Sequence, residues 1–103
     1  MADPMKIRAT LVGDVTEVKV LMSHEMETGQ RKDAQGAIIP AWFIQTVSVM
    51  HGTNTVLAAQ WGPAVSKNPF LSFKFKGGAK GEKVTIAWVD NRGDRRTDEA
   101  TIA

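Results

Sequence analysis

Polar and apolar residues alternate with a period of two along most of the chain, and this pattern limits the possible folds more than any other feature. The alternation is clearest at residues 71–75 and 84–88. Successive side chains of a strand point to opposite faces, so such runs indicate strands with one face on a core and the other in water. No stretch of about ten residues has the spacing of an amphipathic helix. We therefore expect an all-β chain.

Turn-forming residues separate the alternating runs, and Gly13-Asp14 is short enough for a hairpin turn. The predicted strands cover about residues 5–12, 15–23, 40–51, 54–61, 70–76, 82–90 and 95–102. Seven short strands in about 100 residues predict an immunoglobulin-like antiparallel β-sandwich. The length of 103 residues, without repeats or a linker, predicts one domain over residues 1–103.

Composition excludes several classes of protein. The chain has no Cys, which removes disulfides, thiolate nucleophiles and iron–sulfur clusters. No apolar run approaches the roughly 18 residues of a membrane helix, so we expect no membrane association. The first residues contain no apolar core of a signal peptide, so the sequence by itself predicts no secretion signal.

Positive charge is concentrated in one part of the sequence, although the net charge is only +2. Residues 67–83 contain a single acid, Glu82, and the five lysines Lys67, Lys74, Lys76, Lys80 and Lys83. This cluster leaves open the alternative of a basic sandwich that binds nucleic acid or another polyanion. Such binding would weaken steeply with rising salt.

Known catalytic motifs are incomplete in this sequence. His24-Glu25 begins like a zinc-protease motif, but Thr28 occupies the position of the second His. His24 and His51 are the two histidines, and a two-His metal site completed by Glu25 or Glu27 stays open. A copper site is a further alternative, with thioether and imidazole ligands from Met22, His24, Met26 and Met50. We expect no enzyme, no catalytic residues and no cofactor.

The third predicted strand is apolar on both faces, whereas a sandwich buries only one face of a strand in its own core. The alternation places Phe43, Val47 and Val49 on one face, and Trp42, Ile44 and Met50 on the other. Trp61 adds to this surplus. A loop of the same chain or a partner protein must cover such a face, and the enrichment of aromatic and Met side chains in interface cores favours the partner.

Three ordered blocks span nearly the whole chain. They are VKVLMSH with METG and RKD between Val18 and Asp33, NPFLSFKFKGG at 68–78, and WVDN, GD and RTDEA between Trp88 and Ala100. Together they resemble the SoxZ family, the small subunits of the SoxYZ sulfur-carrier complexes. Glu25 and Trp42 depart from the family pattern, in which a Pro and a His are frequent at these positions.

The resemblance implies an immunoglobulin-like fold and a non-enzymatic role. SoxZ-like proteins pair with SoxY, whose Gly-Gly-Cys-Gly-Gly arm carries sulfur intermediates to the enzymes of thiosulfate oxidation. The expected partners are therefore a SoxY-like chain and, transiently, other Sox enzymes, with no nucleic acid. The resemblance also implies a periplasmic location, reached by export with SoxY. The residues expected at the partner surface are Trp42, Ile44, Met50, Trp61, His24, Met26 and Arg96.

Overall fold

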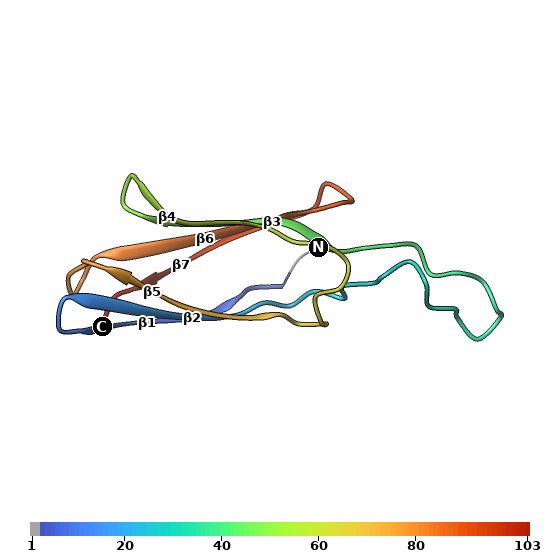
Figure 1. The fold of residues 1–103 in the computed structure, drawn as a ribbon, viewed down its shortest axis with the longest axis horizontal. Helices are drawn as coiled ribbons and strands as arrows, with labels where there is room; N and C mark the ends of the chain where they lie inside the picture. Colours follow the sequence, from blue (N-terminus) through green and yellow to red (C-terminus); the bar gives the residue numbers. More distant parts are fainter. Residues whose placement is uncertain (1–2) are drawn as a thin grey trace.

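The computed structural model describes residues 3–103, which form seven antiparallel strands in two sheets (Figure 1). The strands are β1 (Lys6–Val12), β2 (Val15–Leu21), β3 (Ile44–His51), β4 (Asn54–Gln60), β5 (Phe70–Lys76), β6 (Lys83–Asp90) and β7 (Arg95–Thr101). One sheet has the order β1-β2-β5, and the other has the order β4-β3-β6-β7. The prediction of a seven-stranded β-sandwich is confirmed. None of the described residues forms a helix of the length and apolarity that a membrane crossing requires.

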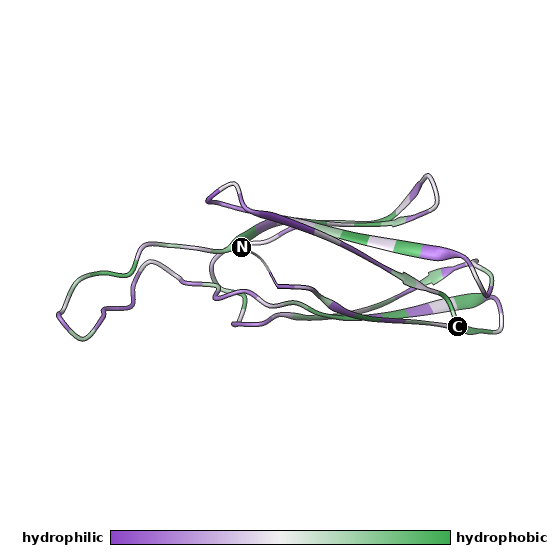
Figure 2. Cartoon of the chain, turned by 180° about the vertical axis from the view of Figure 1, so that it is seen from behind, coloured by the Kyte–Doolittle hydropathy of each residue, from purple (hydrophilic) through white to green (hydrophobic). Residues whose placement is uncertain are grey.

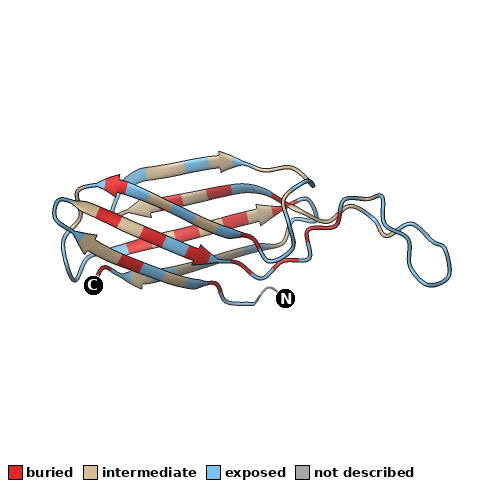
Figure 3. Ribbon diagram, turned by 60° about the horizontal axis from the view of Figure 1, so that its bottom comes forward, coloured by how far each residue is buried: buried red, intermediate tan, exposed pale blue. Residues whose placement is uncertain are grey.

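The core lies between the two sheets and is built from alternate residues of each strand. In β6, Val84, Ile86 and Trp88 are buried, whereas Thr85 and Ala87 between them are half-buried on the other face. More buried and more exposed positions alternate in the same way along β2, β5 and β7 (Figure 3). Apolar and polar residues accordingly alternate along β6 (Figure 2). The period-two pattern of the sequence is therefore the pattern of the core.

A bulge near the start of β3 changes which face Ile44 occupies. Ile44 pairs with Asp90, and Thr46 pairs with the neighbouring Val89, so Gln45 is an extra residue in β3. One extra residue reverses the alternation beyond it. Ile44 is therefore buried on the same side as Val47 and Val49. The prediction that Ile44 shares an outward face with Met50 is wrong, because a regular strand was assumed through residue 45.

The segment between β2 and β3 extends beyond the ends of both sheets as a narrow two-stranded arm (Figure 1). Isolated bridges join Glu27 to Trp42 and Lys32 to Ile38. The described chain consequently measures 53 Å along its longest axis and 20 Å along each of the others. The sequence predicted a loop followed by a strand from residue 40, but β3 begins only at Ile44.

The bulge predicts different effects for Ile44→Ala and Met50→Ala. Ile44 is fully buried, so its truncation leaves a cavity and should lower the free energy of unfolding by about 2–5 kcal/mol. Met50 lies on the outer face, so its truncation should lower the free energy of unfolding by only about 0.5 kcal/mol. Urea denaturation of both variants measures the difference. Equal losses would contradict the placement of Ile44 in the core.

Candidate functional site

The last residue of β6, Asp90, is a buried carboxylate that accepts four hydrogen bonds. Its Oδ2 accepts from His24 Nε2 at 3.0 Å and from Trp42 Nε1 at 2.7 Å. Its Oδ1 accepts from the backbone N–H groups of Arg92 and Asp94, both at 2.9 Å. The side chain of Asp90 has no exposed area, so these bonds replace its hydration completely.

The hydrogen bonds of His24 determine its tautomer. The backbone N–H of Met26 donates to Nδ1 at 3.1 Å, so Nδ1 carries no proton. The ring proton is then on Nε2, from which it is donated to Asp90. Asn68 holds the backbone of His24 by two hydrogen bonds. Its side-chain Oδ1 accepts from the backbone N–H of His24 at 3.0 Å, and its backbone N–H donates to the carbonyl oxygen of His24 at 2.9 Å.

Aromatic rings surround the imidazole of His24. The ring centroids of Trp42 and Trp88 both lie 5.1 Å from that of His24, and Trp88 is nearly perpendicular to it. The guanidinium of Arg92 lies 4.3 Å from the centroid of Trp42, a cation–π contact. Trp42 is thus held by Arg92 at its ring and by Asp90 at its N–H.

The pKa of Asp90 lies below its ordinary value. Burial acts in the opposite direction and raises the pKa, because it penalises the charged form. The hydrogen bonds from His24, Trp42 and the two backbone N–H groups favour the charged form and together outweigh burial. A negative charge is therefore fixed at this end of the core.

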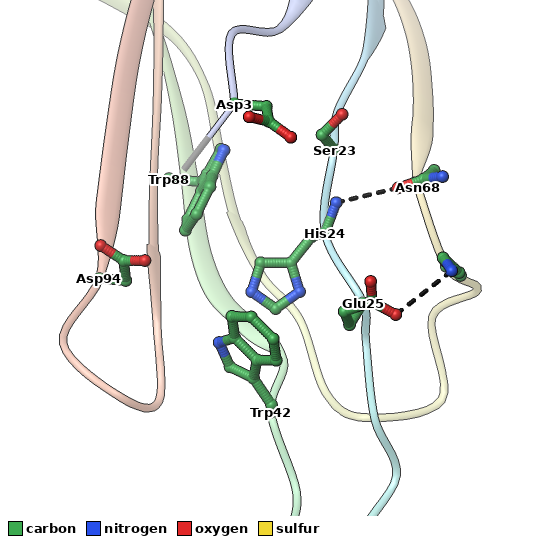
Figure 4. A pocket seen from close by; sticks show the side chains of 9 residues that line it. Asp3, Ser23, His24, Glu25, Trp42, Asn68, Trp88 and Asp94 are labelled. Carbon is green, nitrogen blue, oxygen red and sulfur yellow. Dashed lines mark hydrogen bonds and ion pairs between the residues drawn. The ribbon is translucent and has the colours of Figure 1, made fainter. Parts of the chain in front are cut away.

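A pocket of about 340 Å³ opens beside this cluster (Figure 4). His24, Trp42 and Trp88 form its aromatic part. The buried indole N–H of Trp88 has no hydrogen-bond partner within the described residues. The charged lining residues are Asp3, Glu25, Asp94 and Lys67, and Lys67 Nζ lies 3.3 Å from Glu25 Oε2. Acids outnumber bases, so this pocket does not favour anions.

The outer face of the four-stranded sheet is uncharged at the centre of its two central strands, β3 and β6, and Lys83 at the start of β6 is the nearest charge on them. Its cross-strand pairs there are Thr46 with Val89, Ser48 with Ala87, and Met50 with Thr85. The flanking strands add Ala58 and Gln60 from β4, and Arg95, Thr97 and Glu99 from β7. The charges of this face lie on β7 and at Lys83, which pairs with Glu99 of β7 at 3.0 Å.

The structure separates the residues that the sequence placed at one partner surface. Met50 lies on the outer face of β3, and Trp42 and His24 line the pocket. Ile44 and Met26 are buried, and the sulfur of Met26 accepts the N–H of Ile44 at 3.4 Å. The two remaining members of the set, Trp61 and Arg96, are half-buried.

Trp61 packs against the core, and Arg96 pairs with a neighbouring acid on β7. The backbone N–H of Trp61 donates to the carbonyl of Gln45 at 2.8 Å. The guanidinium of Arg96 donates to both oxygens of Asp98, at 2.8 and 2.9 Å. This pairing lowers the pKa of Asp98 and raises that of Arg96. Both residues therefore already contribute to the packing of the chain itself.

The lysines of residues 67–83 do not form one cluster in space. Lys67 lies at the pocket, whereas Lys74 and Lys76 lie on the outer face of β5 at increasing distance along that strand. Lys74 pairs with Glu17 at 3.3 Å and Lys83 with Glu99 at 3.0 Å. Lys76 and Lys80 are exposed and have no ion pair among residues 3–103. The expectation of a single positive cluster is wrong, because Lys67 lies at the pocket, two of the lysines lie on β5, Lys80 lies in the following loop and Lys83 lies on the other sheet.

The two histidines lie at opposite ends of β3. His24 is bonded to Asp90, which pairs with Ile44 at the start of β3, whereas His51 ends that strand and contacts Glu82 Oε1 at 2.8 Å. The contact with His51 lowers the pKa of Glu82. A two-His metal site is therefore contradicted by the fold. In the described part of the chain, no group of three His, Cys, Asp or Glu side chains is placed to hold a metal.

The copper alternative fails for a related reason. Met22 and Met26 belong to the core, and Met50 lies on the outer face of the four-stranded sheet. These thioethers therefore do not converge with His24 on one site.

The central role of Asp90 was missed in the sequence, although a signal for it was present. Asp90 follows Val84, Ile86 and Trp88 in the same phase of the alternation, so the pattern places an acid on the core face. A buried carboxylate requires hydrogen-bond donors. The turn that follows, with Gly93 at a φ of 83°, supplies two of them from its backbone.

Comparison with known proteins gives one family and one fold. A family model described as "Sulphur oxidation protein SoxZ" matches residues 5–101. No curated protein matches the chain by sequence. A hypothetical protein from Pyrococcus horikoshii has a similar structure, with a TM-score of 0.64 and 17% identity over 99% of this chain and 89% of that chain.

Superoxide reductases also have similar structures. One in the oxidised state has a TM-score of 0.62 and 15% identity over 99% of this chain and 89% of that chain. A variant of the superoxide reductase (neelaredoxin) from Archaeoglobus fulgidus has a TM-score of 0.62 and 19% identity over 99% of this chain and 90% of that chain. At these identities the likeness shows the fold alone.

The Asp90 cluster predicts an acid-sensitive component of stability. Because the folded-state pKa of Asp90 is lowered, its contribution is complete above the unfolded pKa of about 3.9 and is lost as the pH falls through the folded pKa. Asp90→Asn should lower the free energy of unfolding by about 1–3 kcal/mol at pH 7. The difference from the parent should shrink below about pH 4. Urea denaturation over a pH series measures it.

Asp94→Asn is the matched control, because it changes an acid of the same turn that contributes to the cluster through its backbone. It should remain within about 0.5 kcal/mol of the parent. A deficit of Asp90→Asn that is constant at every pH would contradict the account.

Proposed function

The chain belongs to the SoxZ family of sulphur oxidation proteins, and from this membership we propose that it is the non-catalytic subunit of a SoxYZ-type sulfur carrier. Membership of this family makes the chain a subunit of a Sox sulfur-oxidation system. We propose further that it binds a SoxY-like chain and helps to present the sulfur-loaded arm of that chain to thiosulfate-oxidising enzymes. We propose that the protein acts in the periplasm, as the family implies.

The observation that carries the proposal is the uncharged centre of the outer face of β3 and β6. The chain has 13 Lys and Arg and 11 Asp and Glu, yet the cross-strand pairs at the centre of this face contain none of them. Depletion of charge is characteristic of the centre of a protein interface. A sheet face without charges at its centre also suits a second sheet, since sheets stack face to face about 10 Å apart. A second sandwich such as SoxY is the occupant that this face fits.

The state of His24 supports a non-catalytic role. A general base must have a free ring nitrogen within reach of the proton that it removes. Here Nδ1 accepts the N–H of Met26, and Nε2 donates to Asp90. Ser23, the neighbouring hydroxyl residue, therefore has no available base in this ring. The imidazole serves to join the loop after β2 to the end of β6.

Ala87→Arg tests the proposed face. The new charge would stand beside Ser48 at the centre of the face, where a bound partner would desolvate it. The variant should remain folded by circular dichroism and melt close to the parent. Its dissociation constant for SoxY should rise about 30-fold or more. Isothermal titration calorimetry with purified SoxY measures the change.

Ala79→Arg is the matched control, because Ala79 is exposed in the loop between β5 and β6. It should bind SoxY like the parent. Normal binding by a folded Ala87→Arg would place the interface elsewhere. Failure of the parent chain to bind any SoxY would overturn the proposed pairing itself.

A further inference from the structure

The outer face of the three-stranded sheet, on the other side of the sandwich, is strongly basic. The alternation of exposed positions on β1, β2 and β5 is visible where this sheet faces the reader (Figure 3). The basic residues of this face are Lys6 and Arg8 on β1, Lys19 on β2, and Lys74 and Lys76 on β5. The acid of these three strands is Glu17, which pairs with Lys74 at 3.3 Å. Within residues 3–103, the other four cations have no ion pair.

The charge balance along the sequence does not reveal this basic face. Residues 1–36 are nearly balanced, because they contain five basic and six acidic residues. The acids other than Glu17 lie outside β1 and β2, in turns and in the segments at either end: Asp3, Asp14, Glu25, Glu27 and Asp33. Folding therefore separates charges that are mixed in the sequence.

Two cations of this face lie directly opposite each other. Arg8 on β1 pairs in register with Lys19 on β2. Like charges at directly opposed positions of an antiparallel pair are destabilising. Neither side chain has an acidic partner within the described part of the chain. A carboxylate from outside the chain would relieve this repulsion.

Exposed apolar side chains stand beside these cations. Phe70 is 63% exposed and Leu21 is 41% exposed, and the two pair across β2 and β5. Together with Lys6, Arg8 and Lys19 they line a shallow hollow of about 310 Å³. An exposed aromatic next to an exposed aliphatic side chain is a feature of binding surfaces. The hollow therefore offers cationic and apolar contacts at one place.

We propose that this face docks an acidic segment of another protein, with its carboxylates on Arg8 and Lys19 and an apolar side chain against Phe70 and Leu21. The charge selects a polyanion, and the aliphatic Leu21 beside Phe70 offers a contact for an apolar side chain of a polypeptide. Glu17 strengthens that choice, because it lines the adjoining hollow of about 170 Å³ with Arg8 and Lys19 and would repel a continuous phosphate backbone. Since the two sheets face opposite ways, this segment and a partner on the four-stranded sheet can bind together (Figure 1).

The test uses fluorescence anisotropy at low salt to measure the binding of a labelled, capped peptide of six glutamates and two leucines. Arg8→Gln together with Lys19→Gln should weaken binding about tenfold, and added salt should weaken the parent toward the same level. The same double variant should melt no lower than the parent, because it removes a repulsive pair. Phe70→Ser should weaken the binding of this peptide more than it weakens the binding of a second peptide in which serines replace the leucines.

The matched control is Lys32→Gln together with Arg95→Gln, which removes the same charge from exposed positions off this face. The control should bind the peptide within about twofold of the parent. Equal loss in both double variants, or no binding by the parent, would overturn the proposal. Tighter binding of single-stranded oligothymidine of equal charge, with the same sensitivity to Arg8 and Lys19, would assign the face to nucleic acid instead. None of these results depends on SoxY, so they are separate from the test of the SoxYZ pairing.

Discussion

The buried carboxylate of Asp90 joins the parts of the chain that meet at one end of the sandwich. It binds the loop after β2 through His24, the segment before β3 through Trp42, and the turn before β7 through two backbone N–H groups. A charge buried to this extent is tolerated only when its hydrogen bonds are complete. The position of the arm at residues 28–41 depends on this cluster, because both of its ends are held there through His24 and Trp42.

The sandwich presents two outer faces of different chemistry. The four-stranded sheet is uncharged at its centre, whereas the three-stranded sheet carries Arg8 opposite Lys19. The same strand alternation produces both faces, since every second residue of a strand is directed away from the core. A subunit of this construction is suited to hold one partner by packing and to attract another by charge.

The strands were predictable from sequence because burial of one face leaves a period-two record. Seven strands and their approximate limits follow from that record together with the turn-forming residues between the strands. The face of Ile44 did not follow, because the bulge at Gln45 depends on pairing with β6, which a single strand's sequence does not encode. The lysines of residues 67–83 are close in sequence, but folding places them on different elements, which the sequence alone does not reveal. Family membership was carried by the three blocks of residues, whereas the role of Asp90 required the hydrogen bonds themselves.

Methyl NMR can detect directly whether SoxY binds the uncharged centre of the outer face of β3 and β6, as we propose. The chain has five methionines, of which Met50 lies on this face and Met22 and Met26 are buried in the core. In protein labelled at the methionine methyl groups, addition of unlabelled SoxY should shift or broaden the Met50 signal and change those of Met22 and Met26 much less. A complex in which the Met50 signal is unchanged would contradict the account.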